Sequence, residues 1–382
     1  MNRRKESLFI ILSTSLYMIG IAGSRPIVTL YASELGASYF EIGLLVTLFS
    51  VLPLVSSIFL GRKIDKIGQW KPLLASVGLG GLSLSFPLLF RGIAGIYGSQ
   101  IIGGLAQIIF VVAFQSFVGR HSKKKMRDYF VAIFSIGMAS GQFAGPLLGG
   151  LIAERMSYVN SMAILGLFIF MTFPMLLLLN VKNISQAKRM DREAIKEKAN
   201  DLLKIADLRR AIVISAVILL AKDIFTAYFP LLGVDKGFSL TAIGIIISLN
   251  SAAGLIIRIV LPALLVKFNE SQIIVCTIIS AGLLFSLFPL FENALLCSIL
   301  SLLLGFSLGI GQPLSISMTI NALPVQRVGE GLGVRLTVNK MTQVLGPLLL
   351  GGISSVMGMT SVFYFCSAAI LTGSVNLLKK NS

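Results

Sequence analysis

The sequence predicts an all-α membrane protein, with twelve transmembrane helices in two pseudo-symmetric six-helix bundles. Of the 382 residues, 55% are hydrophobic and 13% are charged, and the mean hydropathy is +0.89. A soluble globular chain carries about 25% charged residues. Apolar runs of about 20 residues recur along the chain, and a helix of that length crosses a hydrocarbon core of about 30 Å. Because these runs are continuous, they exclude a transmembrane β-barrel, whose strands alternate apolar and polar residues.

The apolar runs place the twelve expected spans. They cover residues 7–31, 40–60, 72–91, 96–119, 129–153, 160–180, 211–233, 239–265, 272–291, 294–318, 335–356 and 360–378.

The net charge of +17 does not indicate a nucleic-acid-binding protein, because the basic residues lie in short clusters between the apolar runs. If the chain crosses twelve times, these clusters all fall on one side. The other side keeps only Arg91, Arg155 and Lys236 in its loops. Loops rich in Lys and Arg stay in the cytoplasm. We therefore expect a multi-pass protein of the cell membrane (inner or plasma), with both termini cytoplasmic.

A long polar stretch after the sixth run divides the chain into an N-terminal six-helix bundle at 1–180, a cytoplasmic linker at 181–210 and a C-terminal six-helix bundle at 211–382. The two bundles share a motif. "GQFAGPLLGGLIAE" closes the fifth span and "TQVLGPLLLGGISS" closes the eleventh. Internal repeats of this kind are typical of transporters whose substrate site lies between the halves, near the midplane.

Four ionisable residues lie inside the predicted spans: Arg25, Lys222, Asp223 and Arg258. Each costs about 2.5–3.5 kcal/mol near a helix centre, and such residues are functional candidates by default. Asp223 is the strongest because it lies near mid-membrane. Burial disfavours a carboxylate and a nearby cation favours it. A carboxyl group balanced between these effects can take up and release a proton as its surroundings change.

The other three residues keep alternative interpretations. Lys222 and Asp223 are adjacent, so they project about 100° apart on a helix, and at most one points squarely into a cavity. For Arg258 the alternatives are a structural anchor for loops at the cytoplasmic face and a gate or ion-pair role with Asp223. For Arg25 the alternatives are attraction of an anionic substrate, a lock on the outward gate, or a place among the outer headgroups.

The loop after the second span reads "GRKIDKIGQWK" and resembles the loop signature of the major facilitator superfamily. The matching residues are Gly61, Asp65, Lys66, Gly68 and Lys71. Lys63 replaces the usual apolar residue, and Gln69 and Trp70 dilute the usual basic pair. The resemblance implies a cytoplasmic latch between the halves, for which Arg335 and Lys340 are possible partners. The alternative is a solvated basic loop that serves topology alone.

The fifth span, "GMASGQFAGPLLGG", resembles the antiporter motif of the same superfamily, which is commonest among its drug or metabolite:proton antiporters. The matching residues are Gly137, Gly141, Gly145, Pro146, Gly149 and Gly150. Glycines four residues apart line one face of a helix and let a second helix approach closely. Ordinary tight packing is therefore the alternative to an exporter-specific role. The fourth span departs from the pattern, because Gln100 stands where many proton-coupled members carry an arginine.

In this superfamily the first, fourth, seventh and tenth spans line the substrate cavity. The resemblance therefore implies Gln107, Tyr228 and Gln312 as substrate contacts. An interhelical hydrogen bond is the alternative for each of these side chains.

These observations predict a secondary transporter that works by alternating access, with proton-coupled efflux of a small amphipathic molecule or metabolite. One alternative is an importer or facilitator of an anionic metabolite, with the cations of the spans as anion hosts. The other is a non-transporting membrane sensor or scaffold.

The expected partners are a small-molecule substrate, protons and the lipid bilayer. We expect a monomer without a cofactor, a metal or nucleic acid. The three cysteines lie in apolar runs without metal-ligand spacing. We expect no enzyme either. "GFSLG" matches the G-x-S-x-G pattern, but that motif needs a strand-to-helix turn and a histidine partner, and the only histidine lies in a cytoplasmic loop.

Overall fold

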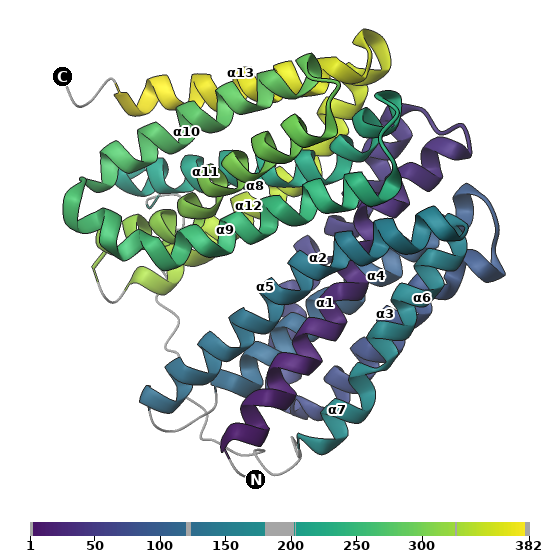
Figure 1. Ribbon diagram of the computed structural model, residues 1–382. Coiled ribbons are helices and arrows are strands. Elements are labelled where there is room, and N and C mark those ends of the chain that lie inside the picture. Colours follow the sequence, from purple (N-terminus) through teal and green to yellow (C-terminus); the bar gives the residue numbers. More distant parts are fainter. Residues whose placement is uncertain (1–2, 120–123, 180–201, 203, 325–326, 379–382) are drawn as a thin grey trace. The chain divides into compact units, whose positions relative to one another are not determined.

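The computed structural model describes residues 3–119, 124–179, 202, 204–324 and 327–378. These residues are almost entirely helical (Figure 1). The first seven helices are α1 (Arg3–Glu34), α2 (Tyr39–Ile67), α3 (Trp70–Leu89), α4 (Ile93–Gly119), α5 (Lys124–Arg155), α6 (Tyr158–Phe170) and α7 (Thr172–Leu178). The later ones are α8 (Ala206–Asp235), α9 (Leu240–Lys267), α10 (Glu270–Leu287), the 3-10 turn η3 (Phe288–Leu290), α11 (Ala294–Asn321), α12 (Val328–Met357) and α13 (Met359–Leu378).

Among the described residues, ten helical stretches are long and apolar enough to cross a membrane. They correspond to the first ten predicted spans, with α6 and α7 together forming one of them. The eleventh predicted span, α12, is not among the ten, and its helix carries Glu330, Arg335 and Lys340. The last span appears as a shorter apolar helix, Met359–Thr372. The count of twelve therefore stays a prediction.

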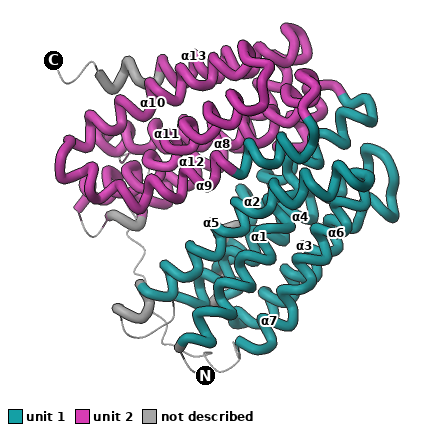
Figure 2. The backbone as a smooth tube through the Cα atoms, in the orientation of Figure 1, with its two compact units in different colours: residues 1–37, 48–191, 239–248 teal, residues 38–47, 192–238, 249–382 magenta. Residues whose placement is uncertain are grey.

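The chain forms two compact units (Figure 2). Unit 1 comprises residues 1–37, 48–191 and 239–248, and unit 2 comprises residues 38–47, 192–238 and 249–382. Most of the predicted linker at 181–210 lies outside the described residues. Its final part is described, and Leu202 is buried there against Leu208, Ile212 and Leu323.

In unit 1, the glycine stripe of α5 packs against α1, and the two helices lie side by side (Figure 1). A β-carbon on Gly141 would lie 2.5 Å from the Met18 β-carbon and 2.6 Å from the Ser15 carbonyl oxygen. A β-carbon on Gly145 would lie 2.7 Å from the Gly23 nitrogen. Real side chains do not approach this closely, so the absence of side chains along this face of α5 sets the distance between the helices.

Gly141→Ala is expected to lower the thermal unfolding midpoint by several degrees, because the new methyl group must push α1 and α5 apart. Overpacking of this kind costs about 1–3 kcal/mol. Gly78→Ala is the matched control, since Gly78 lies in a helix of the same unit with nothing within 4 Å of an added β-carbon. It is expected to leave the midpoint unchanged or to raise it slightly, because alanine favours the helix by about 0.5–1 kcal/mol. The fluorescence of Trp70, the single tryptophan, reports unfolding in detergent. Equal midpoints for the two variants would contradict the packing argument.

One close helix crossing in each unit corresponds to a crossing in the other unit. In unit 2, a β-carbon on Gly43 would lie 3.2 Å from the carbonyl carbon of Pro347. In unit 1, a β-carbon on Gly244 would lie 3.2 Å from the carbonyl carbon of Pro146. The repeated Gly-Pro motif therefore meets a glycine in both units. In α5 the antiporter motif has two contact surfaces: its glycine stripe faces α1, and Pro146 and Gly150 face Gly244.

An aromatic cluster fixes one side of α8 in unit 2. Phe225 and Phe229 stack with ring centroids 4.9 Å apart, and Phe225 contacts Phe288 at 5.1 Å and Phe285 at 6.3 Å. All four rings are fully buried. This packing determines which face of α8 is left for its polar residues.

Candidate functional site

A carboxylate, an amide and an ammonium group form a chain of hydrogen bonds between α8 and α12. The Gln343 Nε2 group donates to Asp223 Oδ2 at 2.8 Å. The Gln343 Oε1 atom accepts from Lys340 Nζ at 2.8 Å. Gln343 is half-buried, as are Asp223 and Lys340. The Gln343 amide therefore bridges an anionic group on one helix and a cationic group on the other.

A second set of hydrogen bonds joins α12 to α11 and α8. Arg335 is only 3% exposed. Its guanidinium donates to Gln312 Oε1 at 2.6 Å and to Ser315 Oγ at 3.0 Å. Gln312 Nε2 in turn donates to the Ser215 carbonyl oxygen at 3.2 Å. In the part of the chain that the structure describes, the hydrogen-bond partners of Arg335 are neutral.

The two sets belong to one polar face of α12. Arg335, Asn339 and Gln343 are four residues apart, so they lie on the same side of the helix. Asn339 lies between the other two and is 5% exposed. Its Oδ1 atom is buried without a hydrogen-bond partner among the described residues. We call Ser215, Asp223, Gln312, Ser315, Arg335, Asn339, Lys340 and Gln343 the α12 polar cluster.

Asp223 contributes the one carboxylate of the α12 polar cluster. Asp223 is an acceptor only while it is ionised, and protonation removes its charge and adds a donor. The attraction that Gln343 transmits between the carboxylate and the Lys340 ammonium then weakens. A change of charge on Asp223 of α8 would therefore alter the attraction to Lys340 of α12, within one compact unit.

The other charges predicted inside spans lie on three different helices. Lys222 is half-buried on α8, and its carbonyl oxygen accepts from Thr226 Oγ1 at 2.9 Å. Arg25 lies on α1 in unit 1, with its guanidinium carbon 4.5 Å from the centroid of the Phe49 ring. Arg258 on α9 is exposed, and its Nε donates to the Gly309 carbonyl oxygen at 3.3 Å. None of these contacts joins Arg258 to Asp223, so an ion pair between them stays a prediction.

The predicted latch residues surround the turn between α2 and α3. Gly61 and Lys66 belong to α2, Lys71 lies in the first turn of α3, and Gly68 joins the two helices. Gly68 has a φ of +84°, a left-handed conformation that favours glycine. This accounts for one fixed glycine of the motif. The side chain of Asp65 lies outside the described residues.

The three predicted substrate contacts belong to different units. Gln107 is half-buried on α4 in unit 1. Tyr228 is fully buried in unit 2, and its hydroxyl donates to the Pro347 carbonyl oxygen at 2.8 Å. Gln312 belongs to the α12 polar cluster. Tyr228 and Gln312 therefore make the interhelical hydrogen bonds that the sequence left open, and their contact with a substrate stays a prediction.

The sequence did not predict that Gln343 belongs to the site or that Arg335 is buried in it. The sequence placed Arg335 at the start of the eleventh span, whereas α12 begins two turns earlier, at Val328. Arg327, at the N-cap of α12, pairs at 3.1 Å with Glu330 in the first turn of this helix. The four-residue spacing of Arg335, Asn339 and Gln343 was the available signal for a polar face.

The apolar helices and the α12 polar cluster together indicate a multi-pass helical membrane protein with charged groups between its helices. Transporters place charged groups in this way. The sequence model of the Major Facilitator Superfamily matches residues 10–339. The chain belongs to this superfamily, and it is a membrane transporter of that fold. The predicted superfamily and its all-α membrane fold are thereby confirmed.

Several relatives align along nearly the whole chain. An uncharacterized MFS-type transporter from Methanocaldococcus jannaschii is 20% identical and covers 99% of both chains. Multidrug resistance protein 2 from Bacillus subtilis is 23% identical, over 97% of this chain and 94% of its own. Quinolone resistance protein NorA from Staphylococcus aureus is 24% identical, over 98% and 96%.

Solved structures share the fold at low identity. The nucleoside transporter NupG superposes with a TM-score of 0.82 at 12% identity, over 98% of this chain and 99% of its own. A peptide transporter, POT, superposes with a TM-score of 0.78 at 17% identity, over 98% and 93%. These likenesses show the architecture of the chain.

Proposed function

We propose that the protein exports a small amphipathic molecule or metabolite in exchange for protons, by alternating access in the cell membrane with both termini cytoplasmic. The observation that carries this proposal is the chain Asp223–Gln343–Lys340, which links a carboxylate to an ammonium group through one amide. The relatives named for multidrug and quinolone resistance support export of amphipathic compounds.

The proposed transport cycle follows from the chemistry of the hydrogen-bond chain Asp223–Gln343–Lys340. Ionised Asp223 holds α8 to α12 through Gln343, and protonated Asp223 holds it less strongly. Proton binding from one side of the membrane and release to the other then favour different positions of these helices. A compound that binds preferentially to one of these states is moved against its gradient, because a ligand shifts a conformational equilibrium only through its different affinities for the two states.

The proposal is tested in reconstituted vesicles with an acidic lumen and a pH-sensitive dye inside. When a transported compound is added outside, an exchanger takes it up and releases protons, so the lumenal pH rises. Protein-free vesicles give the background leak for each compound of the panel. Collapse of the pH gradient with an ionophore should abolish accumulation of the compound. Accumulation that persists without the gradient, with no proton movement, contradicts the proposal.

A facilitator of an anionic metabolite is the second candidate, and Arg335 is the observation that favours it. This cation is buried with neutral partners, and Arg25, Lys222 and Arg258 add three further cations to the helices. In the same vesicles a facilitator would equilibrate anionic compounds and not amphipathic cations or neutral molecules. Uptake would then follow the compound's own gradient.

A further inference from the structure

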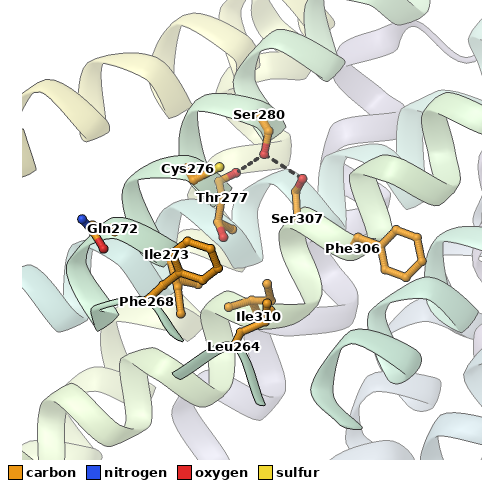
Figure 3. A pocket seen from close by; sticks show the side chains of 10 residues that line it. All are labelled: Leu264, Phe268, Gln272, Ile273, Cys276, Thr277, Ser280, Phe306, Ser307 and Ile310. Atoms are coloured by element: carbon orange, nitrogen blue, oxygen red, sulfur yellow. Dashed lines mark hydrogen bonds between the residues drawn. The ribbon is translucent and has the colours of Figure 1, made fainter. Parts of the chain in front are cut away.

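Unit 2 contains a cavity of about 520 Å³ bounded by α9, α10 and α11 (Figure 3). None of its lining residues is a member of the α12 polar cluster, although both include residues of α11. Small-molecule sites have volumes of about 300–1,000 Å³, and this cavity falls within that range.

Neighbouring helices account for the cavity. Glycines bring α9 and α11 into backbone contact, and a β-carbon on Gly309 would lie 2.6 Å from the Gly254 Cα atom. Pro262 follows in α9, and beyond it Leu264 and Phe268 contribute side chains to the cavity wall. The first turns of α10 close another side, with Ile273 and other residues. The close crossing of α9 and α11 is thus followed by a wider space that side chains leave open.

The lining has two chemically different sides (Figure 3). One carries hydroxyl groups: Ser280 Oγ and Ser307 Oγ are 2.8 Å apart, and Thr277 lies beside them. The other is apolar, with Leu264 and Ile310. Among the ten described residues of the wall, none is a carboxylate, an ammonium or a guanidinium group. An ion would lose its hydration here without a counter-charge, so the wall suits a neutral molecule.

The hydroxyl groups also favour one kind of polar group on the ligand. Ser307 Oγ donates to the Leu303 carbonyl oxygen at 3.2 Å, and Ser280 Oγ donates to the Thr277 carbonyl oxygen at 3.0 Å. The hydrogen bond between the two hydroxyl groups also uses one of these two hydroxyl protons, because each serine has only one. What these hydroxyls still offer is lone pairs, because each oxygen has two. The matching group on a ligand is an O–H or N–H donor.

We propose that this cavity is a second ligand site, which binds a neutral amphipathic molecule with an apolar body and one O–H or N–H donor. The donor lies against Ser280 and Ser307, and the body packs on Leu264 and Ile310. A lipid acyl chain fits the apolar side but carries no group for the hydroxyl side. The proposal concerns binding alone and does not depend on proton coupling.

Cys276 gives the cavity a natural reporter. It lines the wall and is exposed, whereas Cys297 and Cys366 are buried. A maleimide should therefore modify the folded protein in detergent at Cys276, and Cys276→Ser should remove the reaction. The probes are 4-hexylphenol and its methyl ether, which differ in the O–H donor. We expect 4-hexylphenol to slow labelling, at a concentration about threefold to tenfold lower than the ether requires, which is the range for one hydrogen bond.

Three variants decide the outcome. Leu264→Trp fills the cavity and should abolish protection by the phenol, while Leu265→Trp, on the exposed neighbouring residue that does not line it, should retain protection. Ser307→Ala keeps the volume and should make the phenol no better than the ether. Equal protection in all variants would overturn the proposal, because it would reflect partition into the micelle. Absence of labelling at Cys276, or labelling that depends on added phospholipid and is unaffected by the phenol, would overturn it too. The latter result would assign the cavity to an acyl chain.

Discussion

Asp223→Asn is expected to abolish compound-driven proton release in reconstituted vesicles, reducing the dye signal to that of protein-free vesicles. Asparagine has nearly the same shape as aspartate, and its side-chain oxygen can still accept from Gln343 Nε2, which now lies 2.8 Å from the carboxylate. The variant cannot carry a charge or take up a proton there. The hydrogen bond is kept while the titratable group is lost, so the fold should survive and the coupling should not.

Asp235→Asn is the matched control for this prediction. Asp235 is the last residue of the same helix and is exposed. The substitution removes the same charge from α8, outside the α12 polar cluster, so proton release should match the wild type. Both variants should unfold within a few degrees of the wild type. Wild-type proton release in Asp223→Asn would remove this carboxylate from the mechanism and leave its bond to Gln343 as a structural contact.

Arg335→Met is expected to lower transport at least about tenfold while lowering the thermal unfolding midpoint by no more than a few degrees. Burying a charge costs several kcal/mol, and replacing buried ionic groups by apolar side chains of similar size is often neutral or stabilising by about 1–4 kcal/mol. Against this stands the loss of hydrogen bonds to Gln312 and Ser315, worth about 1.5–3 kcal/mol each for a charged group. Together the two bonds amount to about 3–6 kcal/mol, a range that overlaps the gain only in part, so a small net loss of stability is expected.

The measurement pairs a melting curve in detergent with transport of a compound that the panel identifies. Arg335→Lys keeps the charge but loses the planar fork that reaches Gln312 and Ser315 together, and it should retain an intermediate rate. A Met variant that transports normally would show that the charge is dispensable. A variant that unfolds many degrees earlier would show that Arg335 is a structural anchor.

The sequence predicted the helices well where the physical signal is local. Continuous apolar runs correspond to the ten membrane-crossing stretches, and the four-residue spacing of Gly137, Gly141 and Gly145 corresponds to the close contact with α1. The eleventh span was harder because its first turns are polar. The charges at its start are typical of a loop, although in the structure Arg327 and Glu330 form an ion pair one helical turn apart.

The site was predicted in part, and the difference lies in sequence separation. Asp223 stands out because a charge in an apolar run is costly, which a single sequence reveals. Its partner Gln343 is 120 residues away, and no local pattern identifies which of several amides meets it. The same holds for Arg335, whose contact with Gln312 spans 23 residues and two helices. Pairings of this kind depend on how helices rotate against one another, and that follows only from the packed structure.

The residues that make up the two compact units also determine when, during translation, each unit can be completed. Unit 1 includes residues 239–248, which the ribosome makes only after the first six spans and α8. Until they arrive, the Pro146 surface of α5 lacks Gly244. Unit 2 includes residues 38–47, which are made early but meet Pro347 near the end of translation. Both units are therefore completed late. A nascent chain released before residue 244 would leave the Pro146 surface without Gly244, and one released before residue 347 would leave Gly43 without Pro347.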